Sequence, residues 1–243
     1  MNTNHQTAVI KESKMKITAS NLIRWSGLSA MLAGIFYVVV GIFHPLETLS
    51  TVTTTQWAIV HALAVAMSFF GLLGITGIYA RQVAETGWLG WAGYTLLSLW
   101  LVLLVPFTFA EVLLLPRLAA ESPAFVESFL GIFNGHPGAM NLGAIKTLWD
   151  LDGFVYMLGG LLFGSATIRA GLLSRWAGGL LAIGTALAPV AALLPEEHKA
   201  LVAVPVGLAL VWLGYSLWSE RRKPAAQPVP SKGSPQFHRT EVA

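Results

Sequence analysis

Few ionisable side chains interrupt the apolar runs of this sequence, and those that do are the first candidates for chemistry. Glu111 is the one charged residue in the stretch FTFAEVLLLP, residues 107–116. A carboxylate that faces lipid costs a few kcal/mol, so we expect Glu111 to face protein or a water-filled cavity. His61 shares a helix face with Ala64 and Ser68, and this small, polar face predicts that His61 points into a bundle.

A proline close to Glu111 predicts an irregular helix at this point. Pro106 lies five residues before Glu111 and removes the backbone donor that would serve the carbonyl of Val102. We therefore expect a kink or a water pocket beside Glu111.

Other polar residues fall on the same side of the expected topology as Glu111. His44 closes one apolar run, and two aspartates open another. We propose a set that binds a proton or a ligand, formed by Glu111, His61, His44, Asp152 and Asp150. A zinc site is the alternative, and its imidazole donors would come from His44, His61 and His198, with a carboxylate activating water. The sequence identifies no cofactor, and we assign no catalytic residue.

Each of these residues also has an ordinary structural role available. Asp150 can be the acid of a helix capping box in Thr147-Leu-Trp-Asp150. His198 lies between two charged neighbours, which fits a solvated residue. His44 is followed by a proline, so this pair can simply end a helix.

Composition indicates whether these residues lie in a water-soluble protein or in a membrane protein. Of the 243 residues 55% are hydrophobic and only 11% are charged, and the mean hydropathy is +0.65. A soluble domain has charge on about a quarter of its residues. Apolar runs near the ~20 residues that cross a bilayer account for the difference. There is no cysteine, which excludes disulfides and thiolate metal sites.

Six apolar segments predict an all-α, polytopic transmembrane bundle of six helices. The expected spans are 22–43, 57–80, 88–115, 148–172, 176–194 and 199–218. We therefore divide the chain into an N-terminal segment 1–21, a transmembrane domain 22–218 and a basic, proline-rich, disordered tail 219–243. The first span is too long for a signal peptide and has no small-x-small cleavage site, so we expect it to be retained.

The charges predict the orientation of the bundle. Six spans place both termini on one side, and 12 of the 15 lysines and arginines fall on that side. We expect the protein to lie in the cytoplasmic membrane of the cell. The positive-inside rule then places both termini in the cytoplasm. Because the basic balance is explained by topology, we expect the lipid bilayer as a partner and no nucleic acid. The oligomeric state is not determined by these patterns.

Two further patterns concern the arrangement of the helices. The motifs RWSG (24–27), GWAG (90–93) and RWAG (175–178) each open an odd-numbered span, which fits either three repeated helical hairpins or tryptophan anchoring at the membrane interface. Between the third and fourth spans, Ser122-Pro123 is a good helix start and Asn134-Gly135 a good helix end. We expect a short amphipathic helix there, on the outer surface or as a lid.

The order of several motifs resembles a class of uncharacterised bacterial six-span integral membrane proteins. The motifs are RWSGLSAMLAGIFYVVVGIFHP, GLLGITGIYARQ, FAEVLLLP and ATIRAGLLSRWAG, and the resemblance covers residues 22–218. That class has no established activity. The resemblance therefore implies a fold and a location, and it implies no site residues.

Three functions fit these observations. The first is a multi-pass membrane protein that binds or moves a small ligand, a lipid or an ion through an outward-facing polar cavity. The second is a membrane-embedded, metal-dependent hydrolase acting on lipid, although no compact signature such as HExxH or GxSxG is present. The third is a non-catalytic sensor or assembly partner. We favour a non-enzymatic role, with the binding or transport of a ligand or an ion as its sharper form.

Overall fold

The fold is a bundle of antiparallel helices. The computed structural model describes residues 17–136 and 138–220, and this part of the chain contains no strand. The segments 1–21 and 219–243, which were expected to be terminal regions, lie largely outside the described residues. The elements are α1 Ala19–Phe43, α2 Thr55–Phe109, the π-helix η1 Ala110–Leu114, α3 Leu115–Glu121, α4 Pro123–Asn134, α5 Ile145–Ala170, α6 Arg175–Ala186, the 3-10 helices η2 Ala188–Leu193 and η3 Glu196–Val202, and α7 Ala203–Ser219.

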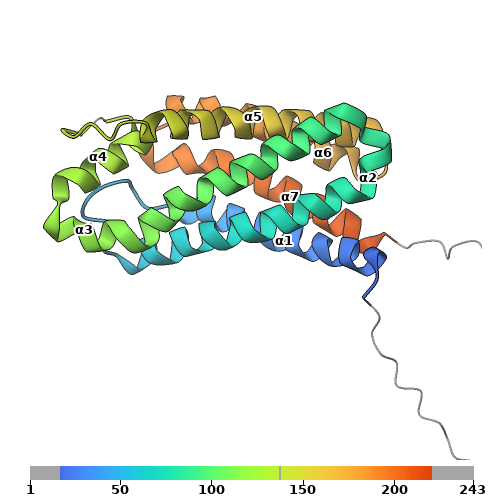
Figure 1. The fold of residues 1–243 in the computed structure, drawn as a ribbon, viewed down its shortest axis with the longest axis horizontal. Coiled ribbons are helices and arrows are strands. Elements are labelled where there is room, and N and C mark those ends of the chain that lie inside the picture. The colour runs from blue at the N-terminus through green and yellow to red at the C-terminus, as the bar shows by residue number, and fades with distance from the viewer. Residues whose placement is uncertain (1–16, 137, 221–243) are drawn as a thin grey trace, which may run out of the picture.

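Helix α2 is a hairpin. Gly87 has φ 56° and ψ −151°, a conformation open to glycine and strained for other residues, and the chain folds back there (Figure 1). The rings of Tyr79 and Tyr94 stack across the hairpin with centroids 4.6 Å apart. The expected spans 57–80 and 88–115 therefore occupy the two arms of one hairpin, and the second arm continues through η1.

The expected count of six spans is not confirmed. Four helical segments in the described part are long and apolar enough to cross a membrane: Ala19–Phe43, Thr55–Glu121, Ile145–Ala170 and Glu196–Ser219. The second of these contains the α2 hairpin. The expected span 176–194 is the 12-residue α6 followed by η2, because Pro189 interrupts regular α-helix. The threefold hairpin repeat also stays a prediction.

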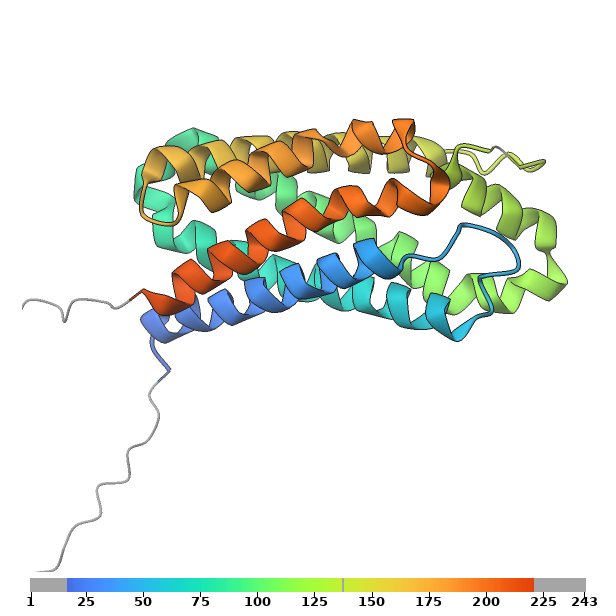
Figure 2. The same ribbon diagram turned by 180° about the vertical axis from the view of Figure 1, so that it is seen from behind.

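Small residues bring the helices close together. Helix α1 packs against α7 and α2, while α2 packs against α5 and α5 against α6 (Figures 1 and 2). A Cβ added to Gly34 would lie 2.4 Å from the backbone oxygen of Gly207, and one added to Gly207 would lie 2.7 Å from the oxygen of Gly34. The two backbones are thus in direct contact, as the four-residue spacing of small residues predicts.

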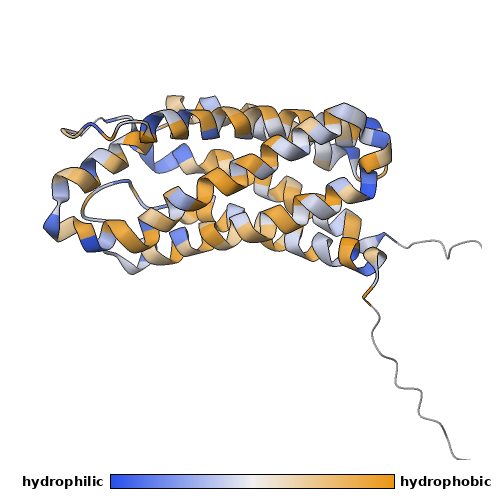
Figure 3. Cartoon of the chain, in the orientation of Figure 1, coloured by the Kyte–Doolittle hydropathy of each residue, from blue (hydrophilic) through white to orange (hydrophobic). Residues whose placement is uncertain are grey.

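The outer surface of the bundle is apolar along its length. Large side chains such as Phe69, Phe154 and Leu208 are at least half exposed. Figure 3 shows hydrophobic residues along the helices and hydrophilic residues gathered toward the two ends. This distribution is that of a protein in which lipid contacts the sides and water the ends.

The expected short helix is present as α4. It begins at Pro123 after Ser122, and it ends at Asn134, followed by the cap residue Gly135 with φ 79°. Its apolar face packs on one end of the bundle, where Val126, Phe129 and Leu130 are buried with Trp57 and other residues of α2. Helix α4 therefore covers the end of the bundle at which α2 begins.

Candidate ligand-binding cavity

A cavity of about 360 Å³ opens at one end of the bundle. The elements around it are the C-terminal end of α1, the first turns of α2 and α5, η1 and η3. Residues 17 and 220, the ends of the described chain, lie at the opposite end (Figure 2). The lining includes four of the residues proposed from sequence, Glu111, His61, His44 and Asp152, together with Glu47, Tyr37, Val40, Val60, Ala64, Met67, Trp100, Leu104, Trp149 and Tyr156.

His61 is the most buried of the histidines at the cavity and has a fixed orientation. Its Nδ1 lies 2.9 Å from the backbone oxygen of Trp57, one turn earlier in α2, and its ring stacks on the Trp57 indole with centroids 4.0 Å apart. A carbonyl only accepts hydrogen bonds, so Nδ1 carries the proton and Nε2 has the lone pair. That Nε2 is buried and has no hydrogen-bond partner. Its nearest charged neighbour is Glu111, whose Oε2 lies 3.6 Å away.

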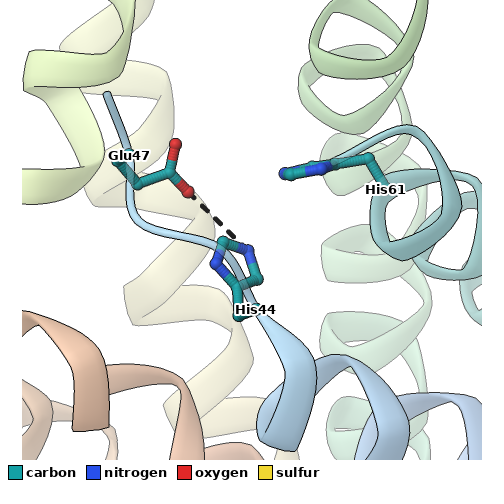
Figure 4. A group of neighbouring side chains, drawn as sticks. All are labelled: His44, Glu47 and His61. Atoms are coloured by element: carbon teal, nitrogen blue, oxygen red, sulfur yellow. Dashed lines mark ion pairs between the residues drawn. The ribbon is translucent and has the colours of Figure 1, made fainter. Parts of the chain in front are cut away.

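His44 and Glu47 approach His61 from the loop after α1. The Nδ1 of His44 lies 2.9 Å from the backbone oxygen of Pro45, which leaves Nε2 as the lone-pair nitrogen of this ring too. His44 Nε2 lies 3.7 Å from Glu47 Oε1, and the other carboxylate oxygen, Oε2, is buried without a partner. Figure 4 shows the three side chains pointing toward a common space. One ligand atom from each residue lies within 4.8 Å of the other two.

Glu111 lies in the π-helix η1. A kink or a water pocket was expected beside Glu111. Helix α2 keeps helical backbone angles at Pro106, and the irregularity lies at Glu111 itself, as the π-turn four residues later. The Trp57 indole Nε1 donates a hydrogen bond of 2.7 Å to the backbone oxygen of Glu111. Trp57 thus touches both His61 and Glu111 and holds them in one position. Single π-turns within α-helices are frequent at functional sites.

The loop that carries Glu47 is tied to its surroundings. Asn134, the last residue of α4, donates a hydrogen bond of 3.1 Å from Nδ2 to the backbone oxygen of Glu47. Gln56 donates one of 2.9 Å to the backbone oxygen of Phe43, the last residue of α1. Both bonds restrict the segment between α1 and α2, so Glu47 and His44 are positioned by contacts from outside their own loop.

The electrostatic surroundings of Glu47 and His44 disfavour charge on both side chains. Burial, with a smaller contribution from the nearby carboxylate of Glu196, raises the pKa of Glu47 to about 8. Burial lowers the pKa of His44, and this outweighs the opposing effect of the Pro45 carbonyl. The nearest cation of this region, Lys199, pairs with Glu196 at 2.5 Å. The buried Oε2 of Glu47 thus has no hydrogen-bond partner in the part of the chain that the structure describes.

Asp152 lines the same cavity from α5. Only 2% of its surface is exposed, and its Oδ1 has no hydrogen-bond partner. Tyr37 and Tyr156 close this side of the cavity, with a hydrogen bond of 3.2 Å between their hydroxyls. The cavity therefore contains three buried acceptor atoms, in Glu47, His61 and Asp152, that no donor of the described residues satisfies.

Two residues proposed from sequence lie outside the cavity, and one important residue was missed. Asp150 is exposed and pairs with Lys146 at 2.7 Å, and the capping box expected there is absent because α5 already begins at Ile145. His198 is exposed beside Glu197 and does not line the cavity. Glu47 was missed, although its spacing of three residues from His44 was a signal in the sequence.

Comparisons with known proteins assign this chain to no family. No family model, no curated protein and no solved structure matches it. The resemblance to bacterial six-span membrane proteins therefore stays a prediction, and the function has to be inferred from the geometry of the cavity.

Proposed function

We propose that this chain is a multi-pass protein of the cytoplasmic membrane that binds a small amphiphilic ligand in the cavity. The apolar body of the ligand would lie against Tyr37, Val40, Ala64 and Met67, and its polar head would reach the cluster of His44, Glu47, His61 and Glu111, which we name the polar cluster. Both termini would be cytoplasmic, and the cavity would open on the outer side.

The orientation is supported by charge and by the position of the chain ends. Residues 17 and 220 lie at one end of the bundle and the cavity at the other. Most lysines and arginines belong to the end with residues 17 and 220 or to the segments beyond them. The positive-inside rule then assigns that end to the cytoplasm and the cavity to the outside.

The observation that carries the proposal is a cavity that combines apolar wall residues with buried polar atoms that have no partner among the described residues. Its volume of about 360 Å³ falls within the ~300–1,000 Å³ of small-molecule sites. Apolar side chains form one part of its wall, and at the other the buried atoms His61 Nε2 and Glu47 Oε2 have no protein partner. Burying an unpaired polar group costs about 1–3 kcal/mol, a cost that a bound polar head would offset.

Native mass spectrometry of the gently extracted protein tests this proposal. Gly153 lines the cavity, and a Cβ added there meets no heavy atom within 4 Å, so Gly153→Phe can obstruct the cavity without a backbone clash. Gly179→Phe is the matched control, because Gly179 has only one contact, at 3.8 Å, and lies outside the cavity. We expect a retained small molecule in the wild type and in Gly179→Phe, and its loss in Gly153→Phe. Equal retention in all three proteins, or an empty wild type, would contradict the proposal.

The role of the polar cluster has its own test. Glu111→Gln keeps the shape of the side chain and removes its ability to ionise. If the head of the ligand reaches the cluster, Glu111→Gln should weaken retention while Asp150→Asn, at an exposed ion pair outside the cavity, should not. Unchanged retention in Glu111→Gln would place the ligand in the apolar part alone.

A metal-dependent lipid hydrolase is the second candidate, and Asp152 is the observation that favours it. This carboxylate is buried on the wall of the same cavity with one oxygen unpartnered, which suits a general base toward a water molecule. Release of fatty acid from an ester-containing lipid by the wild type, abolished in Asp152→Asn, would support this function. No release at any divalent metal concentration would leave the binding function.

A further inference from the structure

We infer that His44, Glu47 and His61 form a binding site for one divalent transition-metal ion of the zinc class, with Glu111 as the fourth ligand. This assignment goes beyond ligand binding by the cavity and does not depend on it. It rests on the orientation of the two imidazoles, the distances between the donor atoms and the absence of protein partners for them.

The orientation of both histidines is that of metal ligands. Each ring donates Nδ1–H to a backbone carbonyl, His61 to Trp57 and His44 to Pro45, at 2.9 Å in both cases. Such a bond fixes the tautomer and directs the lone pair of Nε2 away from the backbone. One contact of this kind is common, but here two rings from different segments each place Nε2 near a carboxylate, His61 near Glu111 and His44 near Glu47.

The distances suit ligands around an ion better than hydrogen bonds. His61 Nε2 lies 3.6 Å from Glu111 Oε2, and His44 Nε2 lies 3.7 Å from Glu47 Oε1. Both separations exceed the ~3.2 Å limit of a good N–H···O bond. A tetrahedral zinc ion with bonds of about 2.1 Å separates its ligand atoms by about 3.4 Å. Small rotations of the side chains would therefore close the site, since no pair within the triad of His44, Glu47 and His61 is more than 4.8 Å apart.

The unsatisfied atoms are acceptors that a metal cation can bind. His61 is 2% exposed, and both its Nε2 and Glu47 Oε2 are buried without a partner. A proton between His61 and Glu111 would leave Glu47 unpaired, and Lys199 is already paired with Glu196. A divalent ion bound by two neutral imidazoles and two carboxylates gives a site of zero net charge. Imidazole ligands favour zinc, copper, iron or nickel over calcium and magnesium.

Cobalt titration of the full chain tests this inference with the metal alone. The protein carries an affinity tag without histidine, is stripped with a chelator in detergent and is dialysed against Co²⁺, with bound metal measured by elemental analysis and visible absorption. We expect one ion per chain in the wild type and at least 100-fold weaker binding in His61→Gln and in His44→Gln. His198→Gln is the control and should bind like the wild type, because His198 is exposed and outside the cavity.

The variants also distinguish the loss of a metal-binding side chain from the loss of folding. Each is first melted without metal, and only variants that unfold at the wild-type temperature are compared. If His61→Gln does not fold, His44→Gln decides the result, since the His44 side chain is 24% exposed at the end of α1. No stoichiometric cobalt in the wild type, equal binding in a folded His44→Gln, or an equal loss in His198→Gln would overturn the metal site. A negative result would not touch the amphiphile proposal, which native mass spectrometry tests separately.

Discussion

Two regions of the bundle differ in how closely they are packed. Helices α1 and α7 are in close contact, whereas the end of the bundle encloses a cavity. Along the contact, Gly27 faces Gly214 and Gly34 faces Gly207, so that an added Cβ would meet backbone oxygen within 3 Å. At the cavity α1 ends at Phe43, and the following loop carries Glu47, whose buried Oε2 has no hydrogen-bond partner among the described residues. The contact between α1 and α7 holds these helices together by close packing. At the cavity the side chains pack less closely, and some buried polar atoms form no hydrogen bond with the described residues.

The difference follows from what a bilayer can and cannot supply. Lipid tails are as apolar as the helix surfaces, so helices associate through close van der Waals contact rather than through the hydrophobic effect. Each unsatisfied polar atom within the bundle therefore has to be offset by such contacts elsewhere. Stability should reside in the glycine contact and chemistry in the cavity, and substitutions in the two regions should have different consequences.

The largest effect is expected at the glycine contact. In Gly34→Leu the new Cβ would lie 2.4 Å from the oxygen of Gly207 and 2.7 Å from the nitrogen of Val211, and neither backbone atom can move away alone. We expect a loss of at least about 3 kcal/mol in the free energy of unfolding, at the upper end of overpacking effects. Thermal unfolding in detergent measures it. Gly153→Ala, where nothing lies within 4 Å, is the matched control and should be neutral or slightly stabilising.

Metal binding should produce the next largest change in stability, and this change should require the metal ligands at the cavity. At a free metal concentration 100 times Kd, a single site that binds the folded state stabilises it by about 2.7 kcal/mol. We expect Co²⁺ or Zn²⁺ to raise the unfolding temperature of the wild type and of His198→Gln. His44→Gln should show no such rise. Mg²⁺ at the same concentration serves as the control for ionic strength, and an equal rise with Mg²⁺ would show that the stabilisation is non-specific.

Trp57→Phe should have an intermediate effect, and it should change both stability and metal binding. The phenyl ring retains an aromatic contact with His61, but the hydrogen bond from the indole to the Glu111 oxygen is lost. A buried carbonyl left without this donor costs about 1–3 kcal/mol. We expect destabilisation in that range and weaker cobalt binding, measured by unfolding and by titration. Full stability with weaker binding would show that Trp57 positions the site without supporting the fold.

The smallest effect is expected at Asp150. Its ion pair with Lys146 is exposed and spaced by four residues on a helix, and such pairs contribute about 0.3–0.5 kcal/mol. Asp150→Asn should change stability by no more than this and should leave metal and ligand retention unchanged. A large loss of either in unfolding or binding assays would mean that Asp150 belongs to the cavity, as the sequence first suggested.

The sequence predicted the parts of the fold that depend on local patterns. Long apolar runs predicted the helices, and Ser122-Pro123 with Asn134-Gly135 predicted the ends of α4 within one residue. The break in the expected span 176–194 was less visible. Pro189 lies in an apolar context, so hydropathy continued through a point where the backbone changes from α-helix to 3-10 helix.

The candidate site was only partly predictable. Glu111 and His61 were conspicuous because ionisable residues are costly in apolar helices. Their proximity could be predicted on the single assumption that the two helices that carry them face each other. Glu47 was hidden because it lies in a loop, where an acid is ordinary. Its role depends on the return of α2 beside α1 and on the bond from Asn134, which are contacts between residues distant in sequence.

Anomalous scattering at the cobalt edge, from crystals of the full chain grown with Co²⁺, tests the central claim most directly. If the unpaired atoms of the polar cluster exist to bind a cation, one strong peak should lie about 2.0–2.2 Å from Nε2 of His44 and of His61 and from a carboxylate oxygen of Glu47. A cavity without a peak, in crystals that contain cobalt elsewhere on the protein, would contradict the claim. The polar cluster would then be a set of buried acceptors satisfied by water or by the head of the ligand alone.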